Sequence, residues 1–351
     1  MRFLLHGATN WGSSNFGDFL YAYEIFTYLK ELDPENKVGF YDASDYFCKY
    51  IDNYEIDKVS LKDADYLVYL PGGYFGEGHK PRFRDNVIQF IRFMPFGLKG
   101  AFFKKKMLVV GVGAGPINSW MMKMSVKTVC KKSTAVSTRD NESRSALQKI
   151  GISDIPNYSD MMVAYDLKSI ARKTEQTNDI LSYAENKKIL LVHYNHSKEA
   201  MEKFALAVSS FVSDHKEYKL VVAADSILPY EQEYFEQFSK LCNEESYHYI
   251  YDDPYELIEL IRMSDAVLTC KLHVGVIACM FNKAVMCAAE HPEKTFRFYK
   301  QVDKTEQCIS LYDSSADQIK ELLTRYHKSV VSVPETETEN AKKHWTILQN
   351  L

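Results

Sequence analysis

Short apolar runs alternate with longer segments of helical period along almost the whole chain. The longer segments predict helices, for example residues 18–31, where Asp18 can cap the first turn. Strands and helices that alternate in this way are typical of βαβ units, so we predict an α/β fold with parallel sheets. The runs that predict strands are residues 2–7, 37–41, 65–70, 107–112 and 134–137, followed in the second half by 188–193, 219–224, 248–251, 266–270 and 284–287.

The polar composition of residues 166–186 predicts a linker between two domains. This segment is rich in Ser, Thr, Asn and Lys and has no sustained hydrophobic period. We therefore expect an N-terminal α/β domain over 1–165 and a C-terminal α/β domain over 187–333, each doubly wound and Rossmann-like. Residues 334–351 fit either a helix packed on the first domain or a solvated tail. Two such domains would face a cleft at the carboxyl ends of their strands, where these sheets bind ligands.

Composition narrows the class of protein. The 351 residues exceed what one hydrophobic core usually serves, and 46% hydrophobic with 26% charged residues is ordinary for globular proteins. Forty-three basic and 47 acidic side chains argue against a nucleic-acid-binding protein but leave room for a small anion held by local cations. Seven cysteines without a C-x-x-C pair suggest reduced thiols. The first apolar run is too short for a signal peptide, and no run reaches roughly 18 apolar residues. We expect a soluble, cytoplasmic protein.

One segment, Phe90 to Lys106, mixes aromatic and basic residues. This composition suits peripheral contact with an anionic membrane surface. It also suits a helix that buries an aromatic face and is followed by a solvated lysine cluster, which is the interpretation we favour. The residues concerned are Phe90, Phe93, Phe96, Phe102 and Phe103 with Arg92, Lys99, Lys104, Lys105 and Lys106.

Three loops after predicted strands carry glycine or short polar residues. An exposed backbone at such a loop attracts anions or sugar oxygens, but a tight turn explains the same residues, and both interpretations stay open. A dinucleotide site is disfavoured because Pro116 stands where the G-x-G-x-x-G spacing requires glycine. The candidate substrate-binding residues in these loops are Asn15, Gly17 and Asp18, then Gly72 and Gly73, then Gly113 and Gly115.

Arg139 follows the strand at 134–137 and is the first candidate for chemistry. A guanidinium at the carboxyl end of a strand matches a carboxylate or phosphate through paired hydrogen bonds. The alternative is a structural pair in which Asp140 caps the next helix or orients Arg139. This motif alone slightly favours the structural pair.

Lys271 and His273 form the sharper candidate. They flank Leu272 where a buried strand turns into an apolar helix, so a fixed cation and a titratable group lie at a helix N-terminus that already favours an anion. Lys294 follows the next predicted strand and either faces the cleft or is solvated. A metal site is not expected at His193 and His196, which lack a third ligand. Cys270 is expected to be inert because it lies in a buried strand.

In their order along the chain, these motifs resemble the polysaccharide pyruvyltransferase family. The resemblance runs to about residue 300 and implies a fold like the GT-B glycosyltransferases. It also implies transfer of the enolpyruvyl group of phosphoenolpyruvate to a sugar diol, which forms a pyruvate ketal and releases phosphate without cofactor or metal. The motifs are Asn15-x-Gly17-Asp18, Gly72-Gly73, Gly111-x-Gly113-x-Gly115-Pro116, Ser137-x-Arg139-Asp140 and Lys271-Leu272-His273.

The resemblance also assigns roles to residues. Arg139 and the basic-Leu-His element at 271–273 correspond to the donor site, with His273 moving a proton. The family usually has arginine at position 271, and lysine keeps the charge but loses the bidentate fork. The expected acceptor is a glycan or lipid-linked sugar in surface polysaccharide biosynthesis, such as exopolysaccharide formation. Two alternatives are a GT-B-like glycosyltransferase that uses a nucleotide sugar, with loose candidates at Asp225, Glu231 and Glu290, and a non-catalytic carbohydrate-binding protein.

Overall fold

The computed structural model describes residues 1–51, 54–77, 83–194 and 197–351, and the chain divides into two compact units. Unit 1 comprises Met1–Ser14, Asp18–Tyr165 and Thr336–Leu351. Unit 2 comprises Asn15–Gly17 and Asp166–Glu335. The chain therefore passes between the units more than once.

Unit 1 is built on a parallel sheet in the order β2-β1-β3-β5-β4, with β6 paired to β5. The five predicted strands form, within a few residues of the predicted ends. The sequence interpretation missed β4, which we took for a turn; Gly72–Phe75 instead pairs with the end of β5 through a register shift. The strands are β1 (Arg2–His6), β2 (Lys37–Phe40), β3 (Tyr66–Tyr69), β4 (Gly72–Phe75), β5 (Lys106–Ala114) and β6 (Ala135–Thr138).

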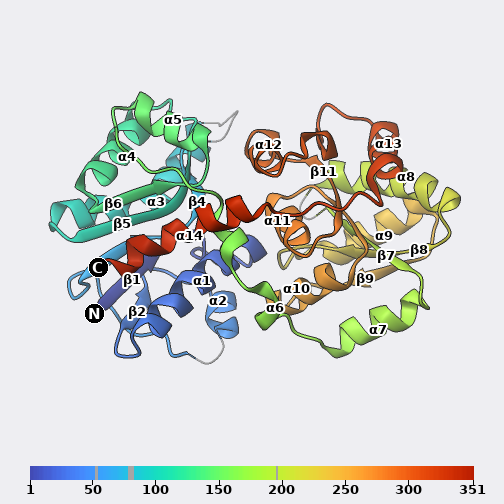
Figure 1. Ribbon diagram of the computed structural model, residues 1–351, viewed down its shortest axis with the longest axis horizontal. Helices are drawn as coiled ribbons and strands as arrows, with labels where there is room; N and C mark the ends of the chain where they lie inside the picture. Colours follow the sequence, from blue (N-terminus) through green and yellow to red (C-terminus); the bar gives the residue numbers. More distant parts are fainter. Residues whose placement is uncertain (52–53, 78–82, 195–196) are drawn as a thin grey trace. The chain divides into compact units, whose positions relative to one another are not determined.

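Helices cover both faces of this sheet. Figure 1 shows α3, α4 and α5 together, and their side chains Phe96, Val126 and Leu147 share one core with the sheet residues Leu67 and Val109. The helices are α1 (Phe16–Leu32), α2 (Asp45–Tyr50), α3 (Phe83–Phe102), α4 (Trp120–Lys132), α5 (Asn141–Lys149) and α14 (Glu335–Gln349), with a 3-10 turn η1 (Met161–Ala164).

Helix α1 begins two residues earlier than the predicted 18–31. The backbone N–H of Phe16 donates to the carbonyl of Asp225 at 2.9 Å, so a tertiary partner satisfies a group that a free helix end would leave open. Asp18 consequently lies in the first turn of the helix and is not its cap. An acidic side chain in the first turn still interacts favourably with the helix dipole.

The Phe90 to Lys106 segment forms the second half of α3 and the start of β5. Phe93 and Phe96 are buried, whereas Phe102 and Phe103 are 79% and 50% exposed. Lys105 donates to the carbonyls of Lys62 and Ala64. A buried aromatic face followed by lysines is the interpretation we favoured, and the membrane contact stays a prediction. Among the described residues, no helix combines the length and apolarity needed to cross a bilayer.

Unit 2 contains a parallel sheet in the order β12-β11-β10-β7-β8-β9. The strand order reverses between β7 and β10, which are hydrogen-bonded neighbours. Open α/β sheets bind ligands at the carboxyl ends of the strands beside such a switch point. The strands are β7 (Lys188–His193), β8 (Tyr218–Ala223), β9 (Ser246–Tyr249), β10 (Ala266–Thr269), β11 (Ala284–Ala289) and β12 (Cys308–Ser310), the last of which was not predicted.

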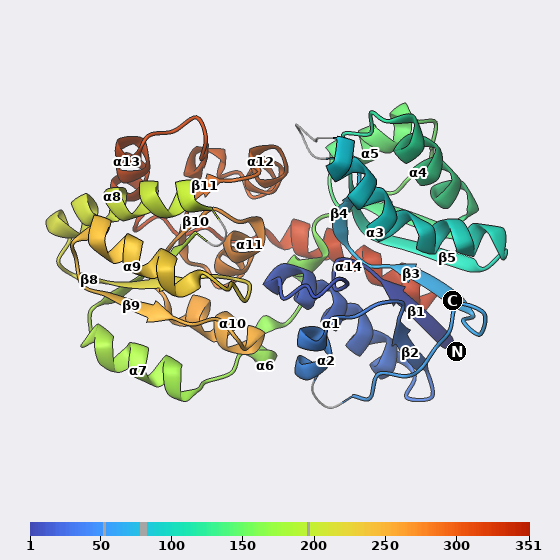
Figure 2. The same ribbon diagram turned by 180° about the vertical axis from the view of Figure 1, so that it is seen from behind.

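One face of this sheet is covered by α8, α9 and α13, and Figure 2 shows α8 and α9 side by side over the strands. Phe204, Phe238 and Leu323 from these helices share a core with Leu220 and Leu268 of the sheet. The helices are α8 (Lys198–Asp214), α9 (Glu231–Cys242), α10 (Pro254–Met263), α11 (Leu272–Met280), α12 (Pro292–Gln301) and α13 (Ala316–Tyr326), with a 3-10 turn η2 (Thr305–Gln307).

The expectation of a linker over 166–186 was wrong. These residues form α6 (Leu167–Ile170) and α7 (Glu175–Ala184), and both belong to unit 2. Thr174 begins α7 with a capping box, and Ile180 is buried. The hydrophobic period escaped notice because α7 buries only one narrow stripe of small and apolar residues. Most of the C-terminal residues 334–351 form α14 (Glu335–Gln349), and 336–351 belong to unit 1.

Candidate functional site

The switch point of unit 2 holds Lys271 and His273 in fixed positions. His193 at the end of β7 and Thr269 at the end of β10 are linked by a 2.9 Å hydrogen bond between Nδ1 and Oγ1. The Thr269 hydroxyl oxygen also accepts from the backbone N–H of Lys271 at 3.0 Å. Helix α11 begins at Leu272, so the turn that carries both candidates is fastened to two adjacent strands.

Lys271 is a compensated cation. Its Nζ lies 2.7 Å from Oε2 of Glu290, the residue after β11. Burial works against the charged amine, but the carboxylates of Asp225 and Glu290 outweigh burial and raise the pKa of Lys271. The lysine is therefore charged at any physiological pH, and an anionic ligand would have to share this cation with Glu290.

Asp225, at the end of β8, supplies the negative charge beneath this turn. It is 2% exposed, and its Oδ1 lies 3.5 Å from Nε2 of His193. Burial alone would raise the pKa of Asp225, but His193, Lys271 and His273 together lower it. A buried carboxylate thus holds a cluster of basic groups at the carboxyl ends of β7, β8 and β10.

Gly17 lies directly against the imidazole of His273. A Cβ atom at position 17 would overlap the ring, and even Cε1 would be 2.6 Å away, below the 3.0 Å that real Cβ atoms essentially never cross. Phe16 anchors the segment through its bond to Asp225 and a 6.4 Å edge contact with the ring of Tyr251. The structure therefore brings together two motifs, Asn15-x-Gly17 and Lys271-Leu272-His273, that lie far apart in the sequence.

Arg139 lies in unit 1, at the carboxyl end of β6, and is 6% exposed. Its Nη1 donates to Oη of Tyr21 at 3.0 Å and to Oδ2 of Asp160 at 3.3 Å. Tyr21 in turn donates to Oδ1 of Asp160 at 2.6 Å. The carboxylate that pairs with Arg139 is therefore Asp160 and not the neighbouring Asp140 that the sequence suggested. Asp140 instead caps α5 and accepts from the N–H of Ser143 at 2.7 Å.

Two of the candidate glycines border the guanidinium. A Cβ at Gly113 would lie 3.2 Å from both Nε and Nη2 of Arg139, and one at Gly73 would lie 3.8 Å from Nη2. Glycine backbone near the start of β4 and near the end of β5 therefore makes room for the Arg139 side chain. Gly72 and Gly115 have packing reasons of their own, since a Cβ there would meet Tyr74 and Ala146.

Glu24 is a member of this cluster that sequence reasoning missed. It is fully buried in α1, and neither carboxyl oxygen has a hydrogen-bond partner among the described residues. Burial and the nearby Asp160 raise its pKa well above the ordinary value. The raised pKa favours the protonated form of Glu24 beside the Arg139–Asp160 pair. Its position in an apolar helix gave a signal, because charged residues are rarely fully buried without a partner.

Arg92 was also missed, because we grouped it with the basic residues of the Phe90 to Lys106 segment. Its Nε donates to Oδ1 of Asn10 at 2.6 Å, and Nη2 donates to the carbonyls of Ala8 and Asn10 at 3.1 Å. Its guanidinium also lies 5.8 Å from the ring centre of Trp11. Arg92 therefore shapes the loop after β1.

The remaining candidates gain less from the structure. Lys294 is half-buried in the first turn of α12, and its role stays a prediction. Oε1 of Glu231 lies 3.5 Å from Nε2 of His248. Burial raises the pKa of Cys270 well above its usual range, in keeping with an inert thiol. His196 lies outside the described residues.

Comparison with known proteins gives one family and one fold. A family model described as polysaccharide pyruvyl transferase matches residues 15–292. A putative UDP-N-acetylglucosamine 2-epimerase from Listeria monocytogenes superposes with a TM-score of 0.70 at 13% identity, over 99% of this chain and 95% of that one. The UDP-GlcNAc 2-epimerase of Neisseria meningitidis bound to UDP-GlcNAc gives 0.64 at 12% identity, over the whole of both chains.

These likenesses confirm two parallel-sheet α/β domains of the GT-B type. At such low identity they carry the fold and no activity. The search of curated proteins returned no match.

Proposed function

This chain belongs to the polysaccharide pyruvyl transferase family, and from that premise we propose that it transfers the enolpyruvyl group of phosphoenolpyruvate to a sugar diol. The product would be a pyruvate ketal, with phosphate released. The observation that carries the proposal is the turn at the switch point of unit 2, where Lys271 and His273 open α11 within the matched residues. A transferase in this family needs an anion site beside a group that moves protons, and this turn offers both.

Donor binding follows from the charges at this turn. Phosphoenolpyruvate carries a carboxylate and a phosphate, and the N-terminus of α11 directs backbone N–H groups toward an anion. Lys271 adds a permanent positive charge whose position is set by Glu290. Because the lysine ammonium is a point charge and cannot make the bidentate hydrogen bonds of an arginine, it binds the donor through charge and does less to fix its orientation. Arg139, in unit 1, is the second cation that we assign to the donor.

His273 is proposed as the proton-transferring group. In the reaction the methylene carbon of the donor gains a proton, one sugar hydroxyl attacks the neighbouring carbon, and the second hydroxyl displaces phosphate. The two hydroxyl protons thus end on the new methyl group and the departing phosphate. An imidazole titrates near neutral pH and can serve either transfer. Gly17 fixes where that ring lies.

The acceptor is proposed to be a glycan or lipid-linked sugar of surface polysaccharide biosynthesis. The exposed Phe102 and Phe103 and the adjoining lysines would suit an anionic membrane surface that presents such an acceptor. This contact is a secondary part of the proposal, and the catalytic assignment does not depend on it.

The proposal is tested by incubating the purified chain with phosphoenolpyruvate and a panel of glycosides. Mass spectrometry should find a pyruvate ketal on at least one glycoside, with an equal amount of phosphate released. In parallel, thermal unfolding should show stabilisation by phosphoenolpyruvate and none by UDP-N-acetylglucosamine. Stabilisation by the nucleotide sugar alone would favour a glycosyltransferase. Binding of glycans without either donor would favour a carbohydrate-binding protein.

The Lys271→Met variant tests the anion site, with Lys203→Met as its matched control. Both lysines are about four-fifths buried in unit 2 and pair with a glutamate, Glu290 at 2.7 Å and Glu199 at 2.6 Å. Loss of a charge-assisted contact worth about 1.5–3 kcal/mol should weaken phosphoenolpyruvate about 10- to 100-fold in Lys271→Met alone. Lys271→Arg should keep donor binding. Equal affinity in Lys271→Met and wild type would remove Lys271 from the donor site.

A further inference from the structure

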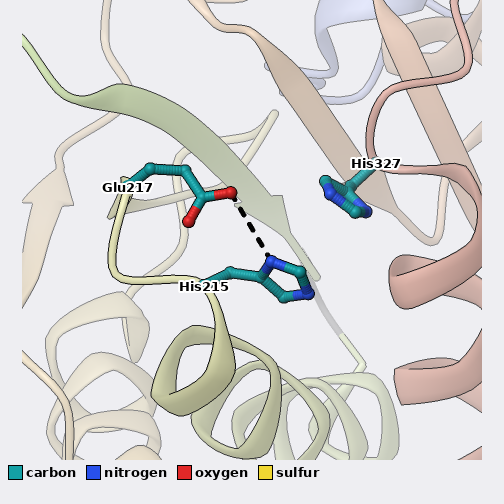
Figure 3. Close-up of side chains that lie close together, drawn as sticks. All are labelled: His215, Glu217 and His327. Atoms are coloured by element: carbon teal, nitrogen blue, oxygen red, sulfur yellow. Dashed lines mark ion pairs between the residues drawn. The ribbon is translucent and has the colours of Figure 1, made fainter.

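A group of three potential metal ligands lies at the opposite edge of the unit 2 sheet from Lys271 and His273. Within residues 1–51, 54–77, 83–194 and 197–351, it is the one group of His, Cys, Asp or Glu whose ligand atoms all come within 4.8 Å of one another. Figure 3 shows its members, His215, Glu217 and His327. His215 and His327 follow the last turns of α8 and α13, and Glu217 immediately precedes β8.

Packing already orders the two imidazole rings. The ring centres of His215 and His327 are 4.6 Å apart, and Phe211 stacks on His215 at 4.3 Å. Oε1 of Glu217 lies 3.5 Å from Nδ1 of His215. Tyr218 donates to the carbonyl of His327 at 3.2 Å. The backbone that carries two of the ligands is therefore tied together before any ion binds.

The hydrogen bonds of His327 decide which of its nitrogens is available. Nδ1 lies 3.1 Å from the carbonyl oxygens of both Leu323 and Thr324. Because a carbonyl can only accept, Nδ1 carries the proton and Nε2 holds a lone pair. His327 is 8% exposed, and among the described residues its Nε2 has no hydrogen-bond partner. Metal-bound histidines commonly show this pattern, with the other ring nitrogen donating to a backbone carbonyl.

The charges around the group are those of the Glu217 carboxylate and of nearby lysines. Lys328 repels a cation, since its charge is felt by both Glu217 and His327. The other nearby lysine, Lys216, is paired with Glu244 at 3.3 Å. The lone pair on Nε2 of His327 and the carboxylate of Glu217 leave the group able to hold a divalent ion beside this one lysine.

We propose that His215, Glu217 and His327 bind a divalent transition metal ion, with Zn²⁺ as the best fit. Two imidazoles and a carboxylate are ligands that Zn²⁺ accepts, and water would complete a tetrahedron. Tetrahedral Zn²⁺ with bonds of about 2.0–2.1 Å needs ligand atoms about 3.3 Å apart. The ligand atoms here lie within 4.8 Å of one another, so each pair would have to approach by at most about 1.5 Å. Glu217 is exposed and can move toward the two imidazoles by changing its side-chain rotamer.

Such an ion would connect the ends of α8 and α13 to the start of β8. Its role would be structural, because the group lies at the amino end of β8 whereas the donor-site residues follow the carboxyl ends of the strands. The inference does not rest on the proposed transfer reaction. Both could hold, and either could fail alone.

The test is calorimetric titration of the untagged, chelator-treated full chain with Zn²⁺, and separately with Mg²⁺. We expect one equivalent of Zn²⁺ to bind and raise the unfolding temperature, and Mg²⁺ to do neither, because it prefers oxygen ligands. Glu217→Gln should weaken Zn²⁺ binding more than about tenfold. This variant changes an exposed side chain, so it keeps the fold. Co²⁺ should give visible bands typical of tetrahedral coordination in wild type and lose them in His215→Gln.

The matched control is His248→Gln. His248 also lies in unit 2, faces a glutamate at 3.5 Å and stacks on an aromatic ring, but has no third ligand in the described chain. Its affinity for Zn²⁺ should equal that of wild type. Absence of stoichiometric Zn²⁺ binding would overturn the inference. So would equal binding by Glu217→Gln, His215→Gln and wild type, because the ion would then be bound elsewhere, for example at the exposed Cys48.

Discussion

Replacing Gly17 by alanine should disable His273 without unfolding the protein. The added Cβ would overlap the imidazole, and Cε1 at 2.6 Å would have to retreat by about 0.4 Å merely to reach the 3.0 Å limit. Because the overlap reaches the inner part of the ring, His273 must adopt another rotamer. Alanine itself suits the first turn of α1 and is favoured over glycine in helices by up to about 1 kcal/mol.

The expected effect on rate is large compared with the effect on stability. Misplacement of a reacting group by about 1 Å can cost about 100-fold, and loss of positioned proton transfer costs about 10²- to 10⁴-fold. Gly17→Ala should therefore lower acceptor-dependent phosphate release by about 10²- to 10⁴-fold. Its free energy of unfolding should stay within about 1 kcal/mol of wild type.

The double variant separates this explanation from a general disturbance. In a His273→Ala background the ring is gone, so Gly17→Ala should cause no further loss of rate. The four proteins would be compared by phosphate release and by thermal unfolding. A wild-type rate for Gly17→Ala, or a further loss above about tenfold in the double variant, would refute the reasoning. An NMR measurement of the His273 ring would show its displacement independently of activity.

Two further predictions concern buried titratable groups in unit 1. Glu24 has a raised pKa in the folded state, so its protonated form stabilises the fold below the ordinary glutamate pKa and that stability is lost as pH rises toward the folded value. Glu24→Gln keeps the shape of the side chain but does not titrate. Its free energy of unfolding relative to wild type should therefore increase with pH above about 4.5, by at most about 1.4 kcal/mol per pH unit. A difference that does not depend on pH would contradict the assignment. His344 has a pKa lowered to about 4, chiefly by burial, so the unfolded chain binds its proton first as pH falls and stability drops between about 6.5 and 4. The full loss is about 3 kcal/mol, and chemical denaturation across this range should show a shallower pH dependence in His344→Gln than in wild type.

The sequence predicts the central strands of both sheets well because they are short apolar runs with both faces covered. The strands that it missed are β4 and β12. Residues 188–193, for example, match β7 at both ends. Prediction failed where tertiary contacts decide the outcome. Gly72–Phe75 becomes a strand only because β5 continues beside it, and α7 becomes a helix because a capping box and a narrow apolar stripe suffice once unit 2 covers it.

The candidate site was predictable where its residues are neighbours in the sequence. Lys271 and His273 could be found because a strand end turns into a helix at that point. The partners of Arg139 could not, because Tyr21 is 118 residues away from it in the sequence. The glycine at position 17 was noticed for its backbone freedom, whereas its function in the structure is to leave space for a side chain from a distant motif. Spacing along the chain says nothing about such pairs.

The C-terminal helix has a practical consequence for dissecting this protein. Helix α14 buries Ala341, His344 and Leu348 in unit 1, and His344 joins the hydroxyl of Ser137 to the carbonyl of Ser159. A fragment that ends at Tyr165 would lack α14, would expose the apolar surface that this helix covers, and should aggregate or misfold. Unit 1 can therefore be isolated only if residues 336–351 are joined to the amino-terminal part of the chain through an engineered linker. Simple truncation would remove them.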